Sequence, residues 1–518
     1  MDKSNIIPAT GIAIGCCALT YLIYTWTKRQ TKDGIPHVPG YPLIDNMFDM
    51  IPATFFENMA KHQEKYGKMF RLKMLSQKFL HISDAPLCRE IFQKRPKLLV
   101  RGHVLDPMAT SFNYLPYGLF HSNDAVVWGR MRKMTSPAFS KQNLTNMSGL
   151  LYLEVMDFVR QLHSLCMKSE KIDMVKEATG YTVRVISRVA FGNDQVDYFF
   201  GEQFYKDVRA TFDIMLESAM FPFPRWIWML TPHYKQELLA VEANKRFSAA
   251  CQEVISIKRA QHAQMSEEEK KHTRSLIDIM IRQDGYNDDE VLANVKTFYL
   301  AGSDTTSMSI SWAVYLLAQH PAIVEKVRLE AQQFFAAVEA STAPVAVESL
   351  THDNMAIYEA LGAMVFTHAV LKESIRLFPA GPAIFLDFAC AEEAEPLVLS
   401  TGLTVPTDTT LLLNVWQCLL DERYFENPRT FQPDRWLTED RALLGRMDQG
   451  FLGFGAGARA CPGMGLAMDE GTMALAAIFH YFDVELMCPA EEVKPEFKFT
   501  LQPSKLPVKI TPRAGMSL

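Results

Sequence analysis

The sequence contains no cysteine pattern typical of a structural zinc site or a disulfide framework. Its nine cysteines are scattered as single residues, apart from the adjacent pair Cys16 and Cys17, and no C-x-x-C or Cys/His cluster occurs. The simplest interpretation is a protein of a reducing compartment.

An excess of basic residues is also missing. The formal net charge is −6, and no basic face stands out along the chain. Because proteins that bind nucleic acid generally carry a basic patch, we expect no nucleic-acid partner. The composition, with 48% apolar and 22% charged residues, is that of a globular protein.

Charge is absent altogether from residues 6–26. As a helix this segment would be about 31 Å long, which matches the hydrocarbon core of a bilayer. Lys28, Arg29 and Lys32 follow it, so the positive-inside rule places the rest of the chain in the cytosol. A cleaved signal peptide is the alternative, but the apolar run is long for one and its stronger positive flank is on the wrong side. We therefore expect residues 1–33 to be a membrane anchor with a basic flank.

A proline-rich stretch, residues 34–46, follows the anchor. Pro36, Pro39 and Pro42 recur every three residues and stiffen the chain. The stretch is either a semi-rigid hinge, which would set the height of a catalytic domain above a membrane, or an ordinary linker. Residues 47–518 then form one domain with mostly helical patterns and a few short strand-like runs, at 69–75, 78–82 and 410–414.

One helical pattern is unusually long. It covers residues 287–320, with Asn287 or Asp288 as the N-cap and Pro321 after its end. Its middle, AGSDTT, contains poor helix formers whose side chains can compete for backbone hydrogen bonds. The hexapeptide indicates either a tight helix crossing at small residues or a groove that holds a small ligand, to which Asp304 and Thr305 relay protons.

Two further motifs contain opposite charges among apolar residues. In ESIR, Glu373 and Arg376 are three residues apart and share one helix face. Apolar sequence flanks the motif, and a buried ion pair needs further partners. Arg435 of FQPDRW is a candidate for that partner.

The stretch FLGFGAGARACPGMG, residues 451–465, has five glycines around Cys461. Glycine at this density indicates that some group approaches the backbone closely. A helical pattern begins near Met464, so Cys461 lies before a helix N-terminus, where backbone N–H groups and the helix dipole favour a thiolate. A cysteine thiolate is one of the standard axial ligands of haem iron, and Arg459 could pair with a haem propionate.

With these four motifs in this order, the chain resembles the cytochrome P-450 haem-thiolate monooxygenases from about Pro36 to about Pro512. WGRMR adds a weaker match, in which Trp128 and Arg132 correspond to residues that hold a haem propionate. The resemblance implies a mainly α-helical fold with small β-sheets, preceded by one N-terminal transmembrane helix. It also implies a haem b bound between two long helices, the second of which begins near Met464.

The resemblance also implies a role for each motif. Cys461 is the iron ligand, Thr305 hydrogen-bonds dioxygen, and Asp304 helps to deliver protons. Glu373, Arg376 and Arg435 form a network that stabilises the fold. The residues expected to contact the haem are Trp128, Arg132, Ala301, Phe454, Arg459, Cys461 and Gly463.

An anchor joined to a cytosolic domain resembles the microsomal type of this family. That type implies a single-pass protein of the endoplasmic reticulum membrane. Electrons from NADPH arrive through a membrane-bound NADPH–cytochrome reductase, with cytochrome b5 as a further candidate partner. Arg130, Arg132 and Lys133 form a basic cluster that either meets an acidic flavoprotein surface or is a solvated helix face.

The substrate is less constrained. Position in the family fold implies pocket walls at residues 103–120, near Phe298 and Ala301, and at residues 383–385. An apolar lid at residues 221–230 either dips into the membrane or packs in the core. We expect an NADPH-dependent monooxygenase of a lipophile, with a preference for a fatty-acyl or related lipid over a sterol, terpenoid or foreign compound. The alternatives are a haem-thiolate isomerase or dehydratase of lipid peroxides, and a non-enzymatic haem sensor or carrier.

One position departs from the family pattern. Many members have a propionate-binding arginine on the strand after E-x-x-R, where this chain has Leu386 and Asp387. Propionate binding should therefore depend on the remaining donors, Trp128, Arg132 and Arg459. His121 is a further residue that could compensate for the missing arginine.

Overall fold

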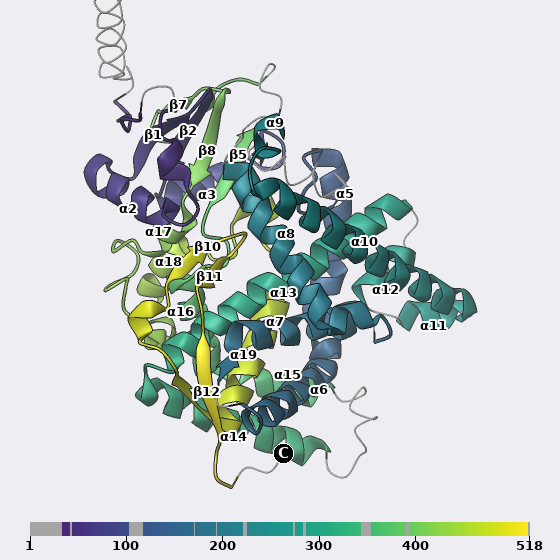
Figure 1. The fold of residues 1–518 in the computed structure, drawn as a ribbon. Coiled ribbons are helices and arrows are strands. Elements are labelled where there is room, and N and C mark those ends of the chain that lie inside the picture. Colours follow the sequence, from purple (N-terminus) through teal and green to yellow (C-terminus); the bar gives the residue numbers. More distant parts are fainter. Residues whose placement is uncertain are drawn as a thin grey trace, which may run out of the picture.

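The computed structural model is a mainly helical fold with small β-sheets (Figure 1), which confirms this part of the predicted fold class. The predicted anchor, residues 1–33, lies outside the described residues, as do 42–43 of the hinge, 103–117 of the first pocket wall and 221–224 of the lid. The structure describes residues 34–41, 44–102, 118–169, 171–192, 194–220, 225–272, 275–282, 286–342, 354–389 and 394–515.

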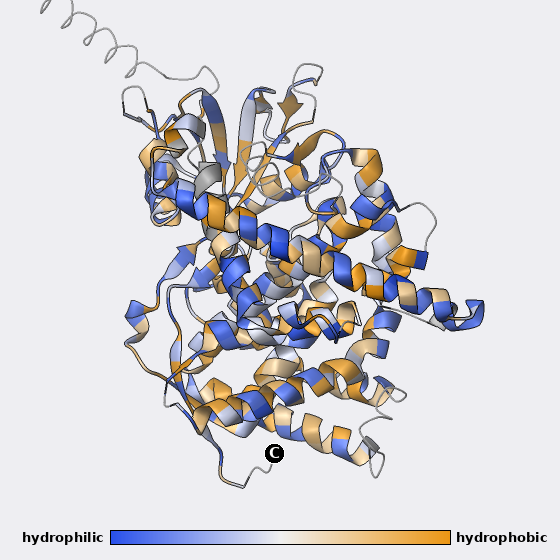
Figure 2. Cartoon of the chain, turned by 45° about the vertical axis from the view of Figure 1, so that its right-hand side comes forward, coloured by the Kyte–Doolittle hydropathy of each residue, from blue (hydrophilic) through white to orange (hydrophobic). Residues whose placement is uncertain are grey.

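Helices account for most of the described chain, and apolar and polar residues alternate around them (Figure 2). The α-helices are α2 (Phe55–Tyr66), α3 (Ala85–Gln93), α5 (Ala125–Thr135), α6 (Lys141–Cys166), α7 (Met174–Val185), α8 (Glu202–Met220), α9 (Arg225–Trp228), α10 (His233–Gln264), α11 (Glu267–His272), α12 (Leu276–Arg282), α13 (Asp288–Leu317), α14 (Pro321–Thr342), α15 (Asn354–Gly362), α16 (Val365–Leu377), α17 (Val415–Leu419), α18 (Arg441–Gly450) and α19 (Met464–Tyr481). Within the described ranges no single helix is long and apolar enough to cross a bilayer, and α15 and α16, bent by 67°, meet that test only as a pair.

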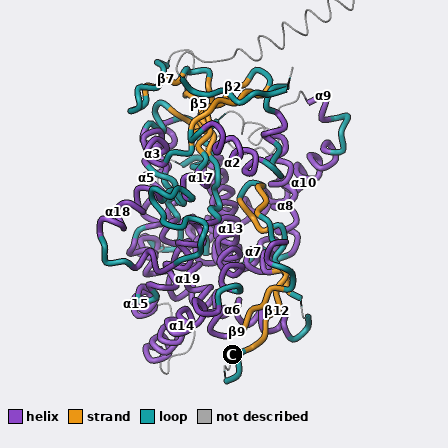
Figure 3. Tube along the Cα trace, turned by 90° about the vertical axis from the view of Figure 1, so that its left-hand side faces the viewer, coloured by secondary structure: helices purple, strands orange, loops and turns teal. Residues whose placement is uncertain are grey.

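The strands form small sheets, the largest at one end of the molecule and a second near the C-terminus (Figure 3). The largest sheet has the order β1-β2-β8-β5-β3, with β2 and β8 parallel and the other pairs antiparallel. The strands β1, β2 and β8 confirm the three predicted strands at 69–75, 78–82 and 410–414. The strands are β1 (Met69–Met74), β2 (Gln77–Ile82), β3 (Leu99–Arg101), β4 (Ile172–Asp173), β5 (Ile384–Phe388), β6 (Leu397–Val398), β7 (Thr404–Val405), β8 (Thr409–Leu413), β9 (Phe482–Leu486), β10 (Pro495–Phe497), β11 (Leu501–Pro503) and β12 (Pro507–Pro512).

The helix α13 passes through the centre of the fold (Figure 1). Asn287 caps it through a reciprocal capping box with Glu290, as the sequence predicts. A Cβ on Gly302 would lie 2.3 Å from the Ile186 side chain, so the small residues of AGSDTT do allow a tight helix crossing. The helix nevertheless stays continuous from Asp288 to Leu317. The Ser303 and Thr305 hydroxyls donate to carbonyls one turn earlier and so compete with the backbone without opening it.

Below the sheet, the ion network predicted from the sequence is present and buried. Arg376 donates to both carboxylate oxygens of Glu373, at 2.8 and 2.9 Å, and Arg435 donates to the same carboxylate at 3.0 Å. Trp436 Nε1 supplies a further donor at 2.9 Å. The remaining Arg376 N–H groups donate to backbone carbonyls of Leu419, Pro428 and Thr430. Glu373 therefore neutralises two cations and joins α16 to the segment that follows α17.

Replacing Glu373 with Gln is expected to lower the free energy of unfolding by about 3–5 kcal/mol, because both arginines would remain buried without their counter-ion. Urea denaturation of the purified protein measures this loss. The matched control is Glu325→Gln, which breaks an exposed pair with Arg328 and should cost less than about 1 kcal/mol. Equal losses in the two variants would show that the buried network does not stabilise the fold.

Candidate active site

Cys461 lies in the loop between a 3-10 turn, Gly457–Arg459, and the start of α19. The Cys461 side chain is accessible, and its backbone N–H donates to the Phe454 carbonyl at 3.0 Å. Gly463 is the N-cap residue of α19, which begins at Met464 as predicted. The cysteine is thus held by a closed loop at a helix N-terminus.

The glycines of this loop serve mainly the protein's own turns and packing. Gly455 and Gly457 have φ of +71° and +70°, which strain residues with a side chain. A Cβ on Gly457 would lie 2.7 Å from the Phe92 carbonyl oxygen, and one on Gly453 would lie 2.8 Å from the Ile375 side chain. The groups that approach Gly453 and Gly457 closely are therefore atoms of neighbouring protein segments.

The ionisation of Cys461 depends on opposing effects. Desolvation by the protein atoms packed around the loop raises the pKa of its thiol, while the backbone N–H of Gly463 and the guanidinium of Arg132 lower the pKa. Desolvation is the largest effect, and the Gly463 N–H acts in the direction that the sequence predicts for a helix N-terminus. A metal cation at the sulfur would complete that stabilisation, because metal-bound thiols lose their proton.

A turn of α13 is accessible although most of this helix is buried. Ala301 is exposed and Thr305, one turn later, is half-buried. Thr305 Oγ1 donates to the Ala301 carbonyl at 2.7 Å. A small side chain and a hydroxyl group therefore face open space in the middle of a core helix, which fits a ligand lying against this turn.

Asp304 does not share that surface with Thr305. Its side chain is buried, and its carboxylate accepts a hydrogen bond from Thr500 Oγ1 at 2.7 Å. Consecutive residues are about 100° apart around a helix, so neighbours in sequence face different surroundings. Burial raises the pKa of Asp304 to about 6, although the Thr500 hydroxyl and Arg209 both lower it.

Cations gather around the cysteine loop. The Arg459 guanidinium lies 4.7 Å from the centre of the Trp128 ring and donates to the Ser122 carbonyl at 2.5 Å. Burial, followed by the charges of Arg95 and Arg101, lowers the pKa of Arg459 to about 9. Burial also lowers the pKa of Arg95 to about 10. The positive charges of these buried arginines therefore repel one another when no anion is bound.

This cluster fits the two propionates of a haem. In the part of the chain that the structure describes, no carboxylate forms an ion pair with Arg95, Arg132 or Arg459. Buried cations are costly unless an anion neutralises them, and a haem beside Cys461 would bring two carboxylates. Burial and Arg101 lower the pKa of His121 to about 3, so this histidine adds no charge.

Two of these arginines were not found from the sequence. Arg101 is on β3 and pairs in register with Leu386 of β5, beside the position where the family arginine is missing. Leu386 itself is buried, and Asp387 accepts a hydrogen bond from Thr410. No motif indicates Arg95 or Arg101, because strand pairing and helix packing bring them to the loop.

The residues predicted to line the substrate pocket and to form the lid differ in their exposure to solvent. In the predicted wall at 383–385, Phe385 is buried and packs near Phe55 and Phe79, while Ala383 and Ile384 are half-buried, so this wall stays a prediction. Phe298 is also buried, with its ring 5.6 Å from that of Phe139. In the described part of the predicted lid, Trp226, Met229 and Leu230 are all exposed.

The predicted basic cluster on α5 is divided by its contacts. Arg130 forms an ion pair with the buried Glu290 at the start of α13. Arg132 lies close enough to Cys461 for the two groups to shift each other's pKa. Lys133 is exposed. The three residues therefore do not form one free basic face.

Sequence comparisons agree with this geometry. A family model described as "Cytochrome P450" matches residues 36–510. "Probable cytochrome P450 4ac1" of Drosophila melanogaster is 26% identical, with 89% of each chain covered. "Salviol synthase" of Salvia pomifera is 26% identical, covering 93% of this chain and 92% of its own, and "Germacrene A hydroxylase" of Barnadesia spinosa is 25% identical, covering 92% and 91%.

Proposed function

Because the chain belongs to the cytochrome P450 family, whose members are haem-thiolate monooxygenases, we propose that it inserts one oxygen atom from O2 into a lipophilic substrate. The electrons come from NADPH through a separate reductase. The observation that carries this proposal is the accessible Cys461 just before α19, beside buried cations that have no carboxylate partner among the described residues.

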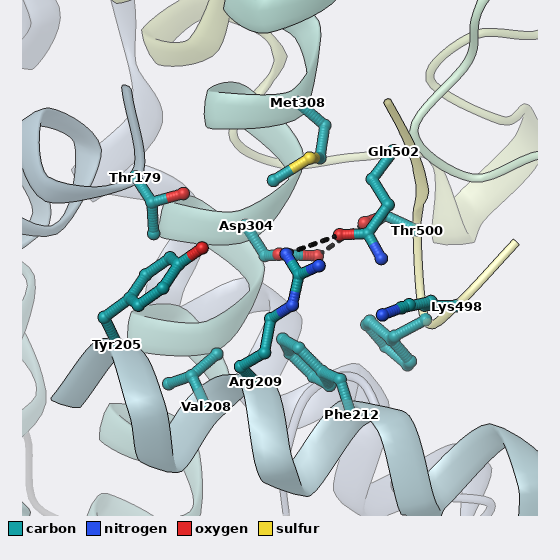
Figure 4. A pocket seen from close by; sticks show the side chains of 11 residues that line it. Thr179, Tyr205, Val208, Arg209, Phe212, Asp304, Met308, Lys498, Thr500 and Gln502 are labelled. Atoms are coloured by element: carbon teal, nitrogen blue, oxygen red, sulfur yellow. Dashed lines mark hydrogen bonds between the residues drawn. The ribbon is translucent and has the colours of Figure 1, made fainter. Parts of the chain in front are cut away.

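Each residue of the site would have its own role in binding or chemistry. Cys461 would ligate the iron, and Trp128, Arg132 and Arg459 would hold the propionates. The haem, when bound, supplies the oxygen chemistry, which an axial thiolate promotes. The Thr305 hydroxyl faces the accessible turn, where its oxygen can accept a hydrogen bond while its O–H donates to the Ala301 carbonyl. Asp304, which accepts a hydrogen bond from Thr500 (Figure 4) and whose pKa is raised by burial, would supply a proton from behind that turn.

We propose a fatty-acyl or related lipid as the substrate. The exposed Trp226, Met229 and Leu230 give the described lid an apolar surface, which suits a compound that arrives from a membrane. Two relatives are named for hydroxylation or oxygenation of other compounds, germacrene A and premnaspirodiene.

A spectral titration of the ferric protein with fatty acids, sterols and terpenoids tests which chemical class of substrate the protein binds. Only a productive ligand should shift the Soret band from low spin to high spin and then yield product.

Thr305→Ala is expected to keep haem and substrate binding while product formed per NADPH falls by about tenfold or more, with peroxide released instead. The reason is the loss of the only hydroxyl at the accessible turn of α13 among the described residues. NADPH, peroxide and product are measured together in the reconstituted system. Ser309→Ala on the same helix is the control, and unchanged coupling in Thr305→Ala would remove this residue from the mechanism.

We propose further that residues 1–33 anchor the protein in the endoplasmic reticulum membrane, with the catalytic domain in the cytosol and NADPH–cytochrome reductase and cytochrome b5 as partners. The uncharged run at 6–26 and the basic residues after it support this topology.

Deletion of residues 1–29 is expected to release only part of the protein from membranes, because the apolar residues near α9 would still bind the surface. Fractionation of cells that express each form measures the released share. Combining the deletion with Trp226→Ser and Leu230→Ser should release the rest. Complete release by the deletion alone would contradict a membrane role for the lid.

A further inference from the structure

Residues 118–124 precede α5 and contact separate elements of the site. Their backbone forms a tight turn, in which the Gly118 carbonyl accepts from the backbone N–H groups of His121, at 3.0 Å, and Ser122, at 2.8 Å. The Ser122 carbonyl accepts from Arg459 of the cysteine loop at 2.5 Å. The turn therefore presents a carbonyl oxygen directly to one of the arginines proposed to hold the propionates.

The C-terminal end of this segment is bound to β3 and begins α5. The Asn123 side chain pairs with the backbone of Arg101, because its Oδ1 accepts from the Arg101 N–H at 3.1 Å and its Nδ2 donates to the Arg101 carbonyl at 3.3 Å. Asp124 then accepts hydrogen bonds from two backbone N–H groups in the first turn of α5 and caps this helix. Since α5 carries Trp128 and Arg132, the segment joins β3, the cysteine loop and α5.

The other end of the segment is fixed to α13 by a buried amide. Asn294 Oδ1 accepts from the Leu119 backbone N–H at 3.0 Å, and both residues are buried. Asn294 Nδ2 donates to the Glu290 carbonyl at 2.7 Å, which fixes the orientation of the amide. Gly118 packs directly on the same helix, since a Cβ on this residue would lie 2.6 Å from Thr297 Oγ1. The segment therefore has little freedom to shift along α13.

The position of Asn294 on α13 places this contact in line with the accessible turn. An α-helix rotates by about 100° and rises by about 1.5 Å per residue. Ala301 follows Asn294 at i+7, after almost two full turns, and Thr305 follows at i+11, after about three turns, so the three residues share one face of the helix. The contact with the segment and the accessible turn are therefore about 10 Å apart along a single continuous helix.

We propose that Asn294 positions Arg459 relative to the accessible turn of α13, acting through residues 118–124 rather than through contact with the haem. The proposal rests on the proposed function, in which Arg459 binds a haem propionate. Asn294→Leu would leave the Leu119 N–H buried without its acceptor, and a buried donor without a partner is unfavourable, so the segment would shift. The Ser122 carbonyl would shift with it, and Arg459 would lose the acceptor that holds its guanidinium.

The test uses Asn294→Leu and Gly118→Ala in the full-length haem-loaded protein. The first variant removes the amide acceptor, and the second introduces a Cβ against Thr297 Oγ1. Adding Thr297→Ala to Gly118→Ala removes this clash and should restore most of the parent behaviour. Asn244→Leu is the matched control, because Asn244 is also a buried amide that accepts from α13, from Lys296 Nζ at 2.9 Å, but it comes from α10.

The first measurement, amide hydrogen exchange, does not depend on turnover. Asn294→Leu and Gly118→Ala should accelerate exchange by about tenfold or more both in residues 119–123 and in residues 455–461 of the cysteine loop, because local opening of the first releases the second. The rescued variant with Thr297→Ala should exchange like the parent, and Asn244→Leu should change neither region. Faster exchange confined to residues 119–123 would overturn the link from Asn294 to Arg459.

The second measurement is a double-mutant cycle on haem affinity, followed by haem transfer to an acceptor protein. Asn294→Leu alone should weaken haem binding by about tenfold. Combined with Arg459→Met it should bind haem within about threefold of Arg459→Met alone, because residues that act through one interaction are not additive. Asn244→Leu should show no such coupling. Multiplied losses in the Asn294 double variant would overturn the proposal.

The two measurements separate this proposal from the proposed function. Unchanged haem affinity in Arg459→Met would refute the proposed propionate site, and the exchange result would still decide whether Asn294 positions Arg459. Weakened affinity in Arg459→Met together with unchanged exchange of the cysteine loop in Asn294→Leu would refute the positioning role alone.

Discussion

Cys461→His is expected to abolish the absorption band of the reduced carbon-monoxide complex that marks thiolate ligation, together with all substrate oxidation. The imidazole replaces an anionic sulfur ligand with a neutral nitrogen, which withdraws the electron density that promotes oxygen cleavage. The loop itself should survive the change, because Cys461 contributes its backbone N–H to the Phe454 carbonyl and its side chain is accessible.

The measurement is the difference spectrum of the dithionite-reduced protein with and without carbon monoxide. Cys488→Ser is the matched control, since Cys488 is also a free and partly accessible cysteine. This control should keep the thiolate band at full intensity. Persistence of the band in Cys461→His would place the iron ligand elsewhere in the chain.

The second large effect concerns haem retention. Arg459→Met and Arg132→Met are each expected to weaken haem binding by roughly tenfold to a hundredfold, because a charged hydrogen bond is worth about 1.5–3 kcal/mol. Combined, they should leave the purified protein largely without haem. Arg101→Met should weaken binding by a similar factor, since Arg101 lies beside the position of the missing family arginine. Haem transfer to an acceptor protein measures the affinity of each variant.

Stability of the haem-free protein separates a binding role from a structural one. Burial and two neighbouring arginines disfavour the charge of Arg459 in the absence of an anion, and methionine retains much of its packing on Trp128. Arg459→Met should therefore lower haem affinity without lowering the unfolding temperature of the haem-free protein. Lys133→Met, at an exposed position of α5, is the control. A parallel loss of affinity and stability would mean that Arg459 holds the loop rather than the propionates.

Local patterns in the sequence were enough for much of the fold and part of the site. The long helix, its Asn287 cap and the helix start at Met464 were predicted because capping and helical periodicity depend on residues only a few positions apart. The partners of Glu373 were also predictable, since an apolar context around a charged pair demands another buried charge. Cys461 was identified by its spacing from neighbouring residues in a single loop.

Only the tertiary structure decided which surroundings neighbouring side chains have, and which residues from distant parts of the chain come together. Asp304 and Thr305 are neighbours in sequence, yet the helix directs Asp304 to Thr500 and leaves Thr305 at the accessible turn. Arg101 reaches the position of the missing arginine through the pairing of β3 with β5.

The glycines of the cysteine loop also have close contacts that the sequence alone does not predict. Gly457 has no room for a side chain because the Phe92 carbonyl of α3 lies against it, although these residues are far apart in the chain. The sequence by itself determined which chemical groups are present and which helices carry them. Packing between elements decided which groups meet, because contacts between residues far apart in the chain leave no periodic pattern in the sequence.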